Sequence, residues 1–246
     1  MTLLVTGASG YLGSELMRRT DAVGISSADV DIRDAAAVAA LFERLRPQTV
    51  IHTAYRGDDR ATTFGGAVNV AAAAAGAQLV HLSTDVVFDG EKGSAYVEED
   101  EPTPITDYGR AKADAERAVL ADHPRTLVVR TSLIYGGPQP GPQERLVEDG
   151  DATFFTDEVR CPIHVGDLAA ALLELAATDL SGVLHVAGAD RLSRHEFAQL
   201  LAGRAVRGAS LADAGVVRPR DCTLAIDRAR GLLRTRLRGA REVLGP

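Results

Sequence analysis

The sequence is poor in the residues that build aromatic, disulfide-bonded or metal-binding cores. It contains no tryptophan, two methionines, six phenylalanines and five tyrosines in 246 residues, so its core must consist mainly of Ala, Leu and Val. Its two cysteines, Cys161 and Cys222, provide neither a disulfide framework nor a metal-ligand spacing. The six histidines lie outside any HExxH or Cys-pair pattern, so we expect no metal site. No apolar run approaches the ~18 residues of a membrane span, and we expect no membrane partner.

The charge balance also narrows the class of protein. The formal net charge is −7, which argues against a nucleic-acid partner. The arginines Arg218 and Arg220 and the stretch 228–241 are candidates for phosphate binding, or they form a solvated helix face. The opening segment MTLLVTGASG lacks a basic leader and has only a short apolar run, so we expect no secretory signal and a cytoplasmic protein.

Short apolar runs alternate with longer amphipathic runs along the first half of the chain. The predicted strands are 2–6, 21–25, 49–54, 77–83 and 125–132. The predicted helices between them are 11–20, 34–47, 61–76 and 108–123. This order predicts an α/β fold, a Rossmann-type doubly wound parallel sheet with helices on both faces.

After residue 132 the pattern becomes irregular. A strand at 182–188 and a helix at 193–203 with Ser193 as its N-cap are predicted, and the last forty residues show no clear strand. We therefore expect a single Rossmann-type unit over 1–246, with its main dinucleotide-binding core at 1–132. The mixed segment 133–246 is expected to complete the sheet and to form a small C-terminal substrate lobe at the carboxyl edge, where ligands bind in such folds.

The segment TGASGYLG follows the first predicted strand and opens the first helix. Gly7 permits a tight turn, Gly10 allows close approach of a pyrophosphate, and Gly13 allows close packing of helix on strand. The alternative is a purely structural turn, but the strand before the glycines and the helix after them favour a dinucleotide site.

The end of the second predicted strand bears on the choice of cofactor. It carries Ser26 and Ser27 where a carboxylate would exclude a 2′-phosphate, so NADPH is permitted and slightly preferred. No arginine in this stretch is predicted to secure that phosphate, and NADH stays open. Asp31 and Ile32 follow and are expected to flank the adenine, although Asp31 also suits a turn or a helix cap.

The stretch YGRAK places Tyr108 and Lys112 four residues apart, on one face of a predicted helix. A phenol is a weak acid with a reference pKa near ~10, and a neighbouring ammonium lowers that pKa toward neutrality. Such a pair suits proton transfer, although the same spacing also occurs in ordinary surface helices. The glycine loop and the Ser-Thr strand end of STDVVFDG, in this order along the chain, favour the catalytic interpretation.

Together these stretches resemble the extended short-chain dehydrogenase/reductases, and within them the dTDP-4-dehydrorhamnose reductase-like group of sugar-nucleotide-binding proteins. The resemblance covers nearly the whole chain in order. The matching stretches are TGASGYLG, VDIRD, TAY at 53–55, STDVVFDG, YGRAK, RTSLIYG, DEVRCPIHVGDLA, HVAG with SRHEFA, and RPRDCTLAIDRARGLL.

The resemblance implies roles for individual residues. Thr84 would hydrogen-bond the substrate carbonyl, Tyr108 would be the general acid, and Lys112 would tune Tyr108 and hold the nicotinamide ribose. Asp85 and Leu133 fall at substrate-contacting positions. The residues that fall at cofactor positions are Gly7, Gly10, Tyr11, Leu12, Gly13, Asp31, Ile32, Thr53, Ala54, Tyr55, Ser83, Tyr108 and Lys112.

Residue 86 separates this chain from a related group of enzymes, and residue 133 is a departure from the dehydrorhamnose reductases. The related 4,6-dehydratases read Thr-Asp-Glu where this chain reads Thr84-Asp85-Val86, and valine cannot take up a proton. Leu133 stands where the dehydrorhamnose reductases usually carry Trp, so it supplies no planar ring. The strand end therefore favours reduction over dehydration.

The sequence thus predicts an NADPH- or NADH-dependent oxidoreductase that reduces a nucleotide-linked 4-keto-6-deoxy sugar, as in dTDP-rhamnose biosynthesis. Three alternatives stay open: a 4-epimerase with tightly bound NAD, a non-catalytic NADP-binding regulatory subunit, and a reductase of a small non-nucleotide carbonyl. Phosphate groups of the substrate would suit Arg160 or Arg218. Whether the chain forms a homodimer also stays open.

Overall fold

The computed structural model describes residues 2–245, which form two compact units assembled from separate stretches of the chain. The first unit contains residues 2–83, 107–129 and 169–184. The second contains residues 84–106, 130–168 and 185–245. Because both units combine early and late stretches, this partition does not test the expected division of the chain at residue 132, which stays a prediction.

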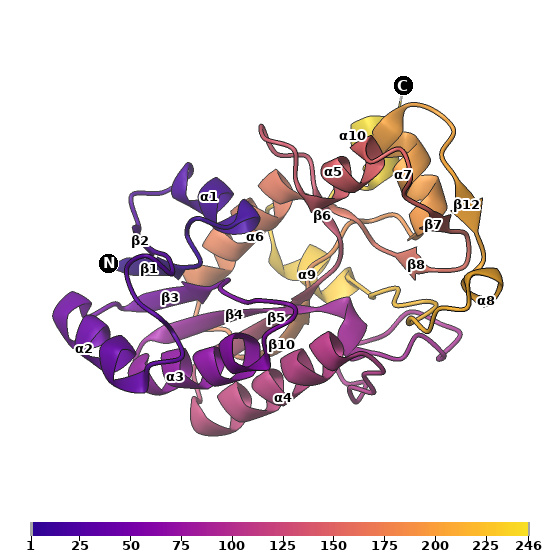
Figure 1. Ribbon diagram of the computed structural model, residues 1–246. Helices are drawn as coiled ribbons and strands as arrows, with labels where there is room; N and C mark the ends of the chain where they lie inside the picture. Colours follow the sequence, from indigo (N-terminus) through magenta and orange to yellow (C-terminus); the bar gives the residue numbers. More distant parts are fainter. Residues whose placement is uncertain (1, 246) are drawn as a thin grey trace. The chain divides into compact units, whose positions relative to one another are not determined.

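A six-stranded sheet in the order β2-β1-β3-β4-β5-β10 is the centre of the first unit (Figure 1). The pairs β1–β2, β1–β3 and β3–β4 are parallel. Nearly every residue of β3, β4 and β5 is buried, as expected for strands covered on both faces. The strands are β1 (Leu3–Thr6), β2 (Val23–Ile25), β3 (Thr49–His52), β4 (Gln78–Thr84), β5 (Thr126–Thr131) and β10 (Gly182–His185).

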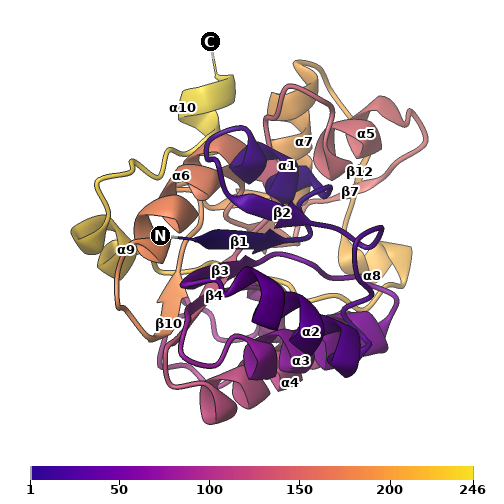
Figure 2. The ribbon, with the colours of Figure 1, turned by 90° about the vertical axis from the view of Figure 1, so that its left-hand side faces the viewer.

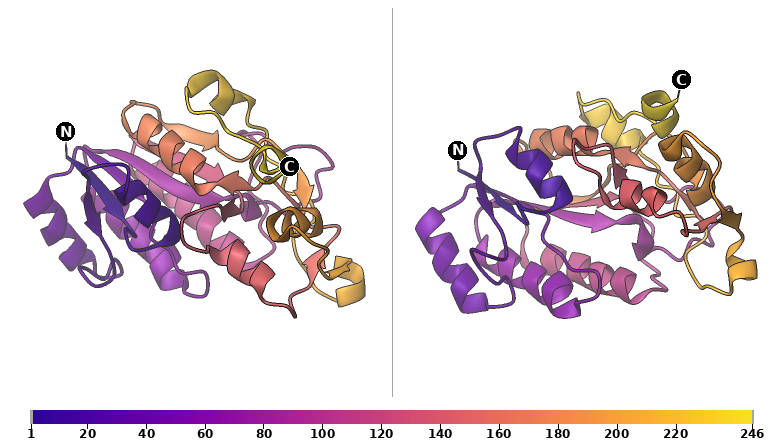
Figure 3. Two further views of the ribbon diagram at one scale, coloured as in Figure 1. Left: turned by 90° about the horizontal axis from the view of Figure 1, so that it is seen from above. Right: turned by 45° about the horizontal axis from the view of Figure 1, so that its top comes forward.

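Helices cover both faces of this sheet, as Figure 2 and Figure 3 show. One face carries α2 (Ala35–Leu45), α3 (Gly66–Ala73) and α4 (Asp107–Asp122). The other carries α1 (Tyr11–Met17) and α6 (Val165–Ala176). The core is aliphatic, as the composition predicts; its members include Val38, Val50, Val70, Leu79 and Val119. The predicted doubly wound α/β fold is confirmed.

Capping residues and glycine set the boundaries and the packing of α2 and α3. Asp34 caps α2 by accepting a hydrogen bond from the backbone N–H of Ala37, and α2 ends at Arg46 in a left-handed conformation. A π-helical turn at Ala61–Gly65 leads into α3. A Cβ at Gly66 would lie 2.5 Å from the side chain of Ile32, so glycine lets α3 pack against the segment after β2 without displacing that side chain.

The second unit contains three pairs of two-residue strands. They are β6 (Ile134–Tyr135) with β9 (Ile163–His164), β7 (Phe154–Phe155) with β12 (Gly208–Ala209), and β8 (Val159–Arg160) with β11 (Leu192–Ser193). Its helices are α5 (Pro142–Glu148), α7 (Arg194–Ala202), α8 (Leu211–Ala214), α9 (Asp227–Leu232) and α10 (Ala240–Leu244).

The predicted start of α7 is confirmed, because Ser193 and Glu196 form a capping box there. The last forty residues, in which the sequence shows no clear strand, contain β12, whose two residues are too few to create a periodic pattern. Tyr135, Leu192, Phe197 and Ala240 form a buried cluster, against which Leu133 packs. None of the helices in residues 2–245 is long and apolar enough to cross a membrane.

Candidate active site

A cavity of about 330 Å³ opens in the first unit at the carboxyl ends of β1 and β3. The chain leaves β1 toward β2 on one side, whereas β3 pairs with β1 on the other side. Such a switch point is where open α/β sheets bind ligands. The lining residues are Thr6, Gly7, Ser9, Gly10, Ile25, Ser26, Ser27, Val30, Asp31, Ile32, Arg33, Thr53, Ala54, Tyr55, Arg56 and Thr62.

The glycine loop forms one wall of this cavity. Gly7 has a φ of +73°, and a Cβ there would lie 2.8 Å from the backbone of Ala54. A Cβ at Gly13 would lie 2.0 Å from the carbonyl oxygen of Gly7. The loop after β1 therefore lies directly on the loop after β3, and only glycine permits both the turn and this approach.

A carboxylate–guanidinium pair forms another part of the wall. Arg33 donates from Nη2 to Asp31 at 2.6 Å and from Nε at 2.9 Å, and these hydrogen bonds lower the pKa of Asp31 to about 2. The backbone N–H of Arg33 also donates to Asp31, which is the turn role considered for that residue. Sequence reasoning finds no arginine for Ser26 and Ser27, yet Arg33 lines the same cavity. In the sequence, the matching stretch VDIRD is what could have pointed to Arg33.

Tyr108, on the first turn of α4, lies beside this cavity. Its ring centroid is 5.7 Å from that of Tyr55, a cavity-lining residue whose side chain is largely exposed. The two rings are tilted by 43°, an offset arrangement that aromatic pairs favour. The tyrosine of the predicted catalytic pair thus contacts the predicted cofactor wall within the first unit.

Lys112, one helical turn after Tyr108, is almost completely buried. Its Nζ donates to the carbonyl oxygen of Leu82 at 2.5 Å, which anchors the side chain at the end of β4. Burial lowers the pKa of Lys112 to about 8, against the opposing charge of Glu116. The neutral amine of Lys112 is therefore reached at a lower pH than that of an exposed lysine.

Two buried histidines, one on β3 and one on β4, were not singled out from the sequence. The rings of His52 and His81 stack at 5.3 Å on adjacent strands. Burial, and secondarily the charge of Lys112, lowers the pKa of His52 to about 3. Both rings are therefore neutral at physiological pH, and His52 shares a 2.6 Å hydrogen bond with the hydroxyl of the cavity residue Thr6.

The strand-end residues Thr84 and Asp85 belong to the second unit. The Thr84 hydroxyl accepts from the backbone N–H of Val86 at 3.4 Å and donates to the Asp85 carboxylate at 3.2 Å. Asp85 is buried, and its other oxygen accepts from the hydroxyl of Ser132 at 2.5 Å. Burial raises the pKa of Asp85, while Arg160 opposes that rise.

The predicted site residues thus fall into separate groups. Those that line the cavity are Gly7, Gly10, Asp31, Ile32, Thr53, Ala54 and Tyr55. Those of the first unit that do not line it are Tyr11, Leu12, Gly13, Ser83, Tyr108 and Lys112. Thr84, Asp85 and Leu133 lie in the second unit. The role of each residue stays a prediction. Residues 2–245 hold no cluster of three or more His, Cys, Asp or Glu side chains suited to a metal ion.

The doubly wound sheet, the glycine-walled cavity at its switch point and the Tyr-Lys pair of α4 define an extended short-chain dehydrogenase/reductase. Residues 1–230 match the family described as RmlD substrate binding domain, and the chain belongs to that family.

Three relatives illustrate the range of this family. The dTDP-4-dehydrorhamnose reductase of Mycobacterium tuberculosis is 36% identical over 217 residues, covering 78% of this chain and 71% of that protein. The mouse (Mus musculus) methionine adenosyltransferase 2 subunit beta is 30% identical over 237 residues, covering 81% and 71%. The crystal structure of the Bacillus anthracis dTDP-4-dehydrorhamnose reductase in complex with NADP superimposes with a TM-score of 0.89 at 28% identity, covering 99% and 98% of the two chains.

Proposed function

We propose that the protein is an NAD(P)H-dependent reductase of a keto group in a nucleotide-linked sugar, most specifically a 4-keto-6-deoxy sugar. The contact of Tyr108 with the cavity-lining Tyr55 carries this proposal. A phenol that can donate a proton thus lies beside a wall of the cavity that we propose for the dinucleotide. The buried ammonium of Lys112, one turn away, completes the pair.

The lining of the cavity suits a nicotinamide dinucleotide in its chemistry. Its glycine wall has no room for a Cβ at Gly7, which leaves bare backbone beside the ligand, as pyrophosphate binding requires. Asp31 and Ile32 would flank the adenine, and Thr53 and Ala54 would lie along the middle of the cofactor. When bound, the cofactor supplies the hydride. The Bacillus anthracis relative holds NADP, which supports the same cofactor class here.

We infer a preference for NADPH over NADH from the same wall. Ser26, Ser27 and Arg33 all line the cavity, and none of them is acidic. Arg33 can exchange its bond to the exposed Asp31 carboxylate for a bond to a ribose 2′-phosphate. Two hydroxyls and a guanidinium suit a phosphate better than a bare ribose hydroxyl.

The chain's own residues would handle the proton. Tyr108 donates its phenolic proton to the carbonyl oxygen as that oxygen gains negative charge. Lys112 stabilises the resulting phenolate by charge and restores its proton. Thr84 donates a hydrogen bond to the same oxygen.

The second unit bears on the substrate. Val86 offers no base for removing water, which supports reduction over dehydration. Arg218 and Arg220 have half-exposed to exposed side chains and suit the phosphates of a nucleotide sugar. Arg160 does not, because its side chain is 2% exposed and bonded to protein groups. The expectation that Arg160 holds phosphate is therefore withdrawn.

The rival functions keep specific support. The mouse relative is named as a subunit of another enzyme, which favours the regulatory alternative for some members of this family. A 4-epimerase would retain NAD through purification. A small-carbonyl reductase would accept ketones without a nucleotide, and Leu133 in place of a tryptophan keeps that alternative open. A homodimer and a cytoplasmic location stay predictions.

The test is cofactor oxidation. Purified protein is mixed with NADPH, and separately with NADH, and with dTDP-4-keto-6-deoxyglucose made in place by a 4,6-dehydratase. Turnover that vanishes in Tyr108→Phe supports the reductase. NADPH binding without turnover on the nucleotide sugar contradicts it, and small ketones tested in parallel then separate the small-carbonyl alternative from the regulatory one.

A further inference from the structure

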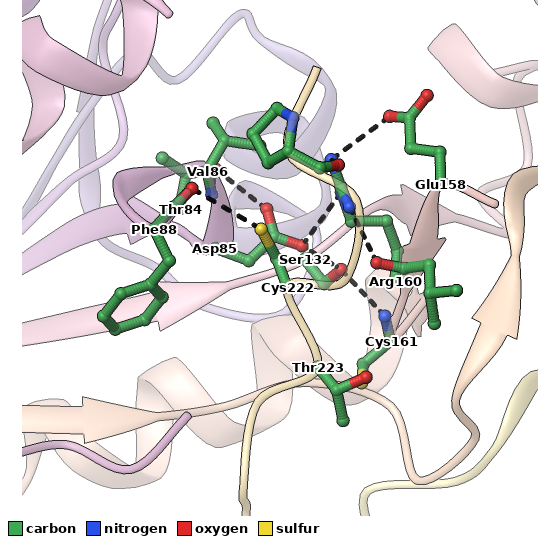
Figure 4. Close-up of polar contacts among 12 residues, drawn as sticks. Thr84, Asp85, Val86, Phe88, Ser132, Glu158, Arg160, Cys161, Cys222 and Thr223 are labelled. Carbon is green, nitrogen blue, oxygen red and sulfur yellow. Dashed lines mark hydrogen bonds and ion pairs between the residues drawn. The ribbon is translucent and has the colours of Figure 1, made fainter. Parts of the chain in front are cut away.

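Arg160 is the hub of a buried polar network in the second unit, drawn in Figure 4. Its Nη1 donates to the carbonyl oxygen of Val159 at 2.7 Å and reaches that of Arg220 at 3.4 Å. Its Nη2 donates to the carbonyl oxygen of Pro219 at 3.0 Å and to the carboxylate of Glu158 at 3.2 Å. The guanidinium thus ties β8 to the segment that carries the arginines proposed for phosphate binding.

The same guanidinium reaches the strand end that carries Thr84. Its Nε lies 3.7 Å from Oδ2 of Asp85, and both side chains are almost completely buried. Oδ2 also accepts from Ser132, whose hydroxyl oxygen accepts from the backbone N–H of Cys161 at 3.1 Å. Oδ1 accepts from the Thr84 hydroxyl, so an unbroken polar chain runs from Arg160 to Thr84 (Figure 4).

This geometry limits what Thr84 can do. A hydroxyl has one hydrogen, and here the Asp85 carboxylate accepts it. The hydrogen can swing to a substrate carbonyl while the oxygen stays in place, but the buried Asp85 then loses one donor. Leaving a buried acceptor unpaired is unfavourable, and the Arg160 charge and the Ser132 hydroxyl that remain reduce that penalty.

We propose that Arg160 is a positioning residue, which holds the Thr84 hydroxyl ready for the substrate carbonyl through the carboxylate of Asp85. The inference rests on the proposed reductase function. It gives Asp85 a role different from the substrate contact that the family resemblance implies, because its side chain is 4% exposed and both of its carboxylate oxygens have protein partners.

The network makes a prediction about protonation. Without Arg160, the rise that burial causes in the pKa of Asp85 is opposed less, so Asp85 takes up a proton at a higher pH. A protonated Asp85 no longer holds the Thr84 hydrogen in the same way. The charged and titratable groups that face Asp85 are Arg160, Glu158, Arg194, Cys161 and Cys222.

The experiment compares Arg160→Gln, Arg160→Lys, Ser132→Ala and Asp85→Asn with wild type. We expect Arg160→Gln to lower kcat/KM for the keto sugar roughly tenfold to a hundredfold. The acid limb of its pH profile should move up by about one pH unit or more. Arg160→Lys should recover part of the loss, and the Kd for NADPH should change less than about twofold.

Ser132→Ala leaves Arg160 intact and removes a donor to Asp85, so it should shift the acid limb in the same direction. It also keeps the test valid if Arg160→Gln does not fold. Arg236→Gln is the matched control, because the Arg236 side chain is 77% exposed and pairs with Glu242 at 3.0 Å, in another part of the unit's sequence. This variant should match wild type.

Two results would overturn the proposal. One is an acid limb that stays at its wild-type position in both Arg160→Gln and Ser132→Ala. The other is a double variant, Arg160→Gln with Asp85→Asn, that loses the full product of the two single losses, since residues acting in one chain are not additive.

Failure of the proposed function would look different. Wild type would then give no turnover. The link between Arg160 and Asp85 can still be tested by a ¹³C NMR titration of the Asp85 carboxyl, assigned with Asp85→Asn, because this titration needs no substrate. A titration unchanged by Arg160→Gln and Ser132→Ala would still refute the link between Arg160 and Asp85.

Discussion

The ring of Tyr108 lies 5.7 Å from the ring of Tyr55, centroid to centroid. Tyr55 follows β3 and lines the cavity, whereas Tyr108 is in the first turn of α4, more than fifty positions later in the sequence. The contact joins the predicted cofactor wall to the predicted acid within one unit. The Tyr-x-x-x-Lys spacing is weak evidence for a catalytic pair on its own. The ring contact adds a position for Tyr108 beside the cavity.

Replacing Tyr108 by Phe should separate chemistry from binding. The ring and its contact with Tyr55 stay, but the proton donor is lost, so kcat should fall roughly 10²- to 10⁴-fold. The Kd for NADPH, measured by fluorescence titration, should be nearly unchanged. Tyr55→Phe is the matched control: it also removes one hydroxyl from the ring pair, and its kcat should change less than about threefold. Equal losses in the two variants would contradict the role of Tyr108.

Lys112 should leave a signature in the pH dependence of stability. Its folded-state pKa is about 8, against 10.5 for an ordinary lysine, because burial disfavours the charge. Below about pH 8 Lys112 is charged in both the folded and the unfolded state, so folding carries the full free-energy cost of burying the ammonium. Between pH 8 and pH 10.5 the unfolded state holds more protons than the folded state, so the free energy of unfolding rises with pH. The gain should approach roughly 3 kcal/mol by the upper end of that window.

Urea denaturation of wild type and Lys112→Met at pH 7 and pH 10 checks this difference. The rise with pH should be smaller in Lys112→Met, which has no charge to bury. Lys92→Met serves as the control, because it also removes one lysine, but one whose side chain is partly exposed and paired with Asp100. A pH response in Lys112→Met equal to that of wild type would refute the shifted pKa.

The sequence predicts the fold well because its signals are local. Apolar runs of strand length, the cap at Asp34 and the glycines at Gly7 and Gly13 each act within a few residues, and five strands lie within two residues of their predicted ends. The contacts that shape the site are not local. Arg160 reaches Pro219, 59 positions away, and no periodicity marks a partner at that distance.

The same difference explains the errors about individual arginines. From the sequence, Arg160 is a candidate for binding phosphate groups of the substrate, and no arginine is predicted to secure a 2′-phosphate of the cofactor. In the structure Arg160 is enclosed by carbonyls and carboxylates, whereas Arg33 lines the cavity next to Ser26. A charged side chain's exposure depends on tertiary packing, which residue type and spacing do not reveal.

Arg33 should set the choice between the two cofactors. Arg33→Gln removes the guanidinium proposed for the 2′-phosphate, and a charge-assisted hydrogen bond is worth ~1.5 to 3 kcal/mol, or roughly 10- to 100-fold. That loss should fall on kcat/KM for NADPH, with the NADH value changed little. Asp31→Asn should weaken the hold on Arg33 and raise the preference for NADPH.

Steady-state kinetics with both cofactors measure this preference directly. Arg44→Gln is the control, because Arg44 is an exposed arginine on α2 that does not line the cavity. Its NADPH/NADH ratio should match wild type. Equal losses for NADPH and NADH in Arg33→Gln would show that Arg33 does not read the phosphate.

Gly7→Ala should abolish cofactor binding because of a steric clash, and Gly76→Ala separates this clash from backbone strain. Gly7 and Gly76 both have positive φ, +73° and +85°, so alanine at either position adds strain of roughly 1 to 2 kcal/mol. At Gly76 a Cβ meets nothing within 4 Å, whereas at Gly7 it would lie 2.8 Å from the Ala54 backbone.

Both variants should therefore unfold at lower urea concentrations than wild type, Gly7→Ala at the lowest. Only Gly7→Ala should lose NADPH binding, because its methyl group forces the glycine loop away from the loop after β3 and reshapes the cavity wall. Fluorescence titration with NADPH, at a temperature where both variants are folded, makes the comparison. If folded Gly7→Ala binds NADPH as wild type does, the cavity at the switch point is not the cofactor site.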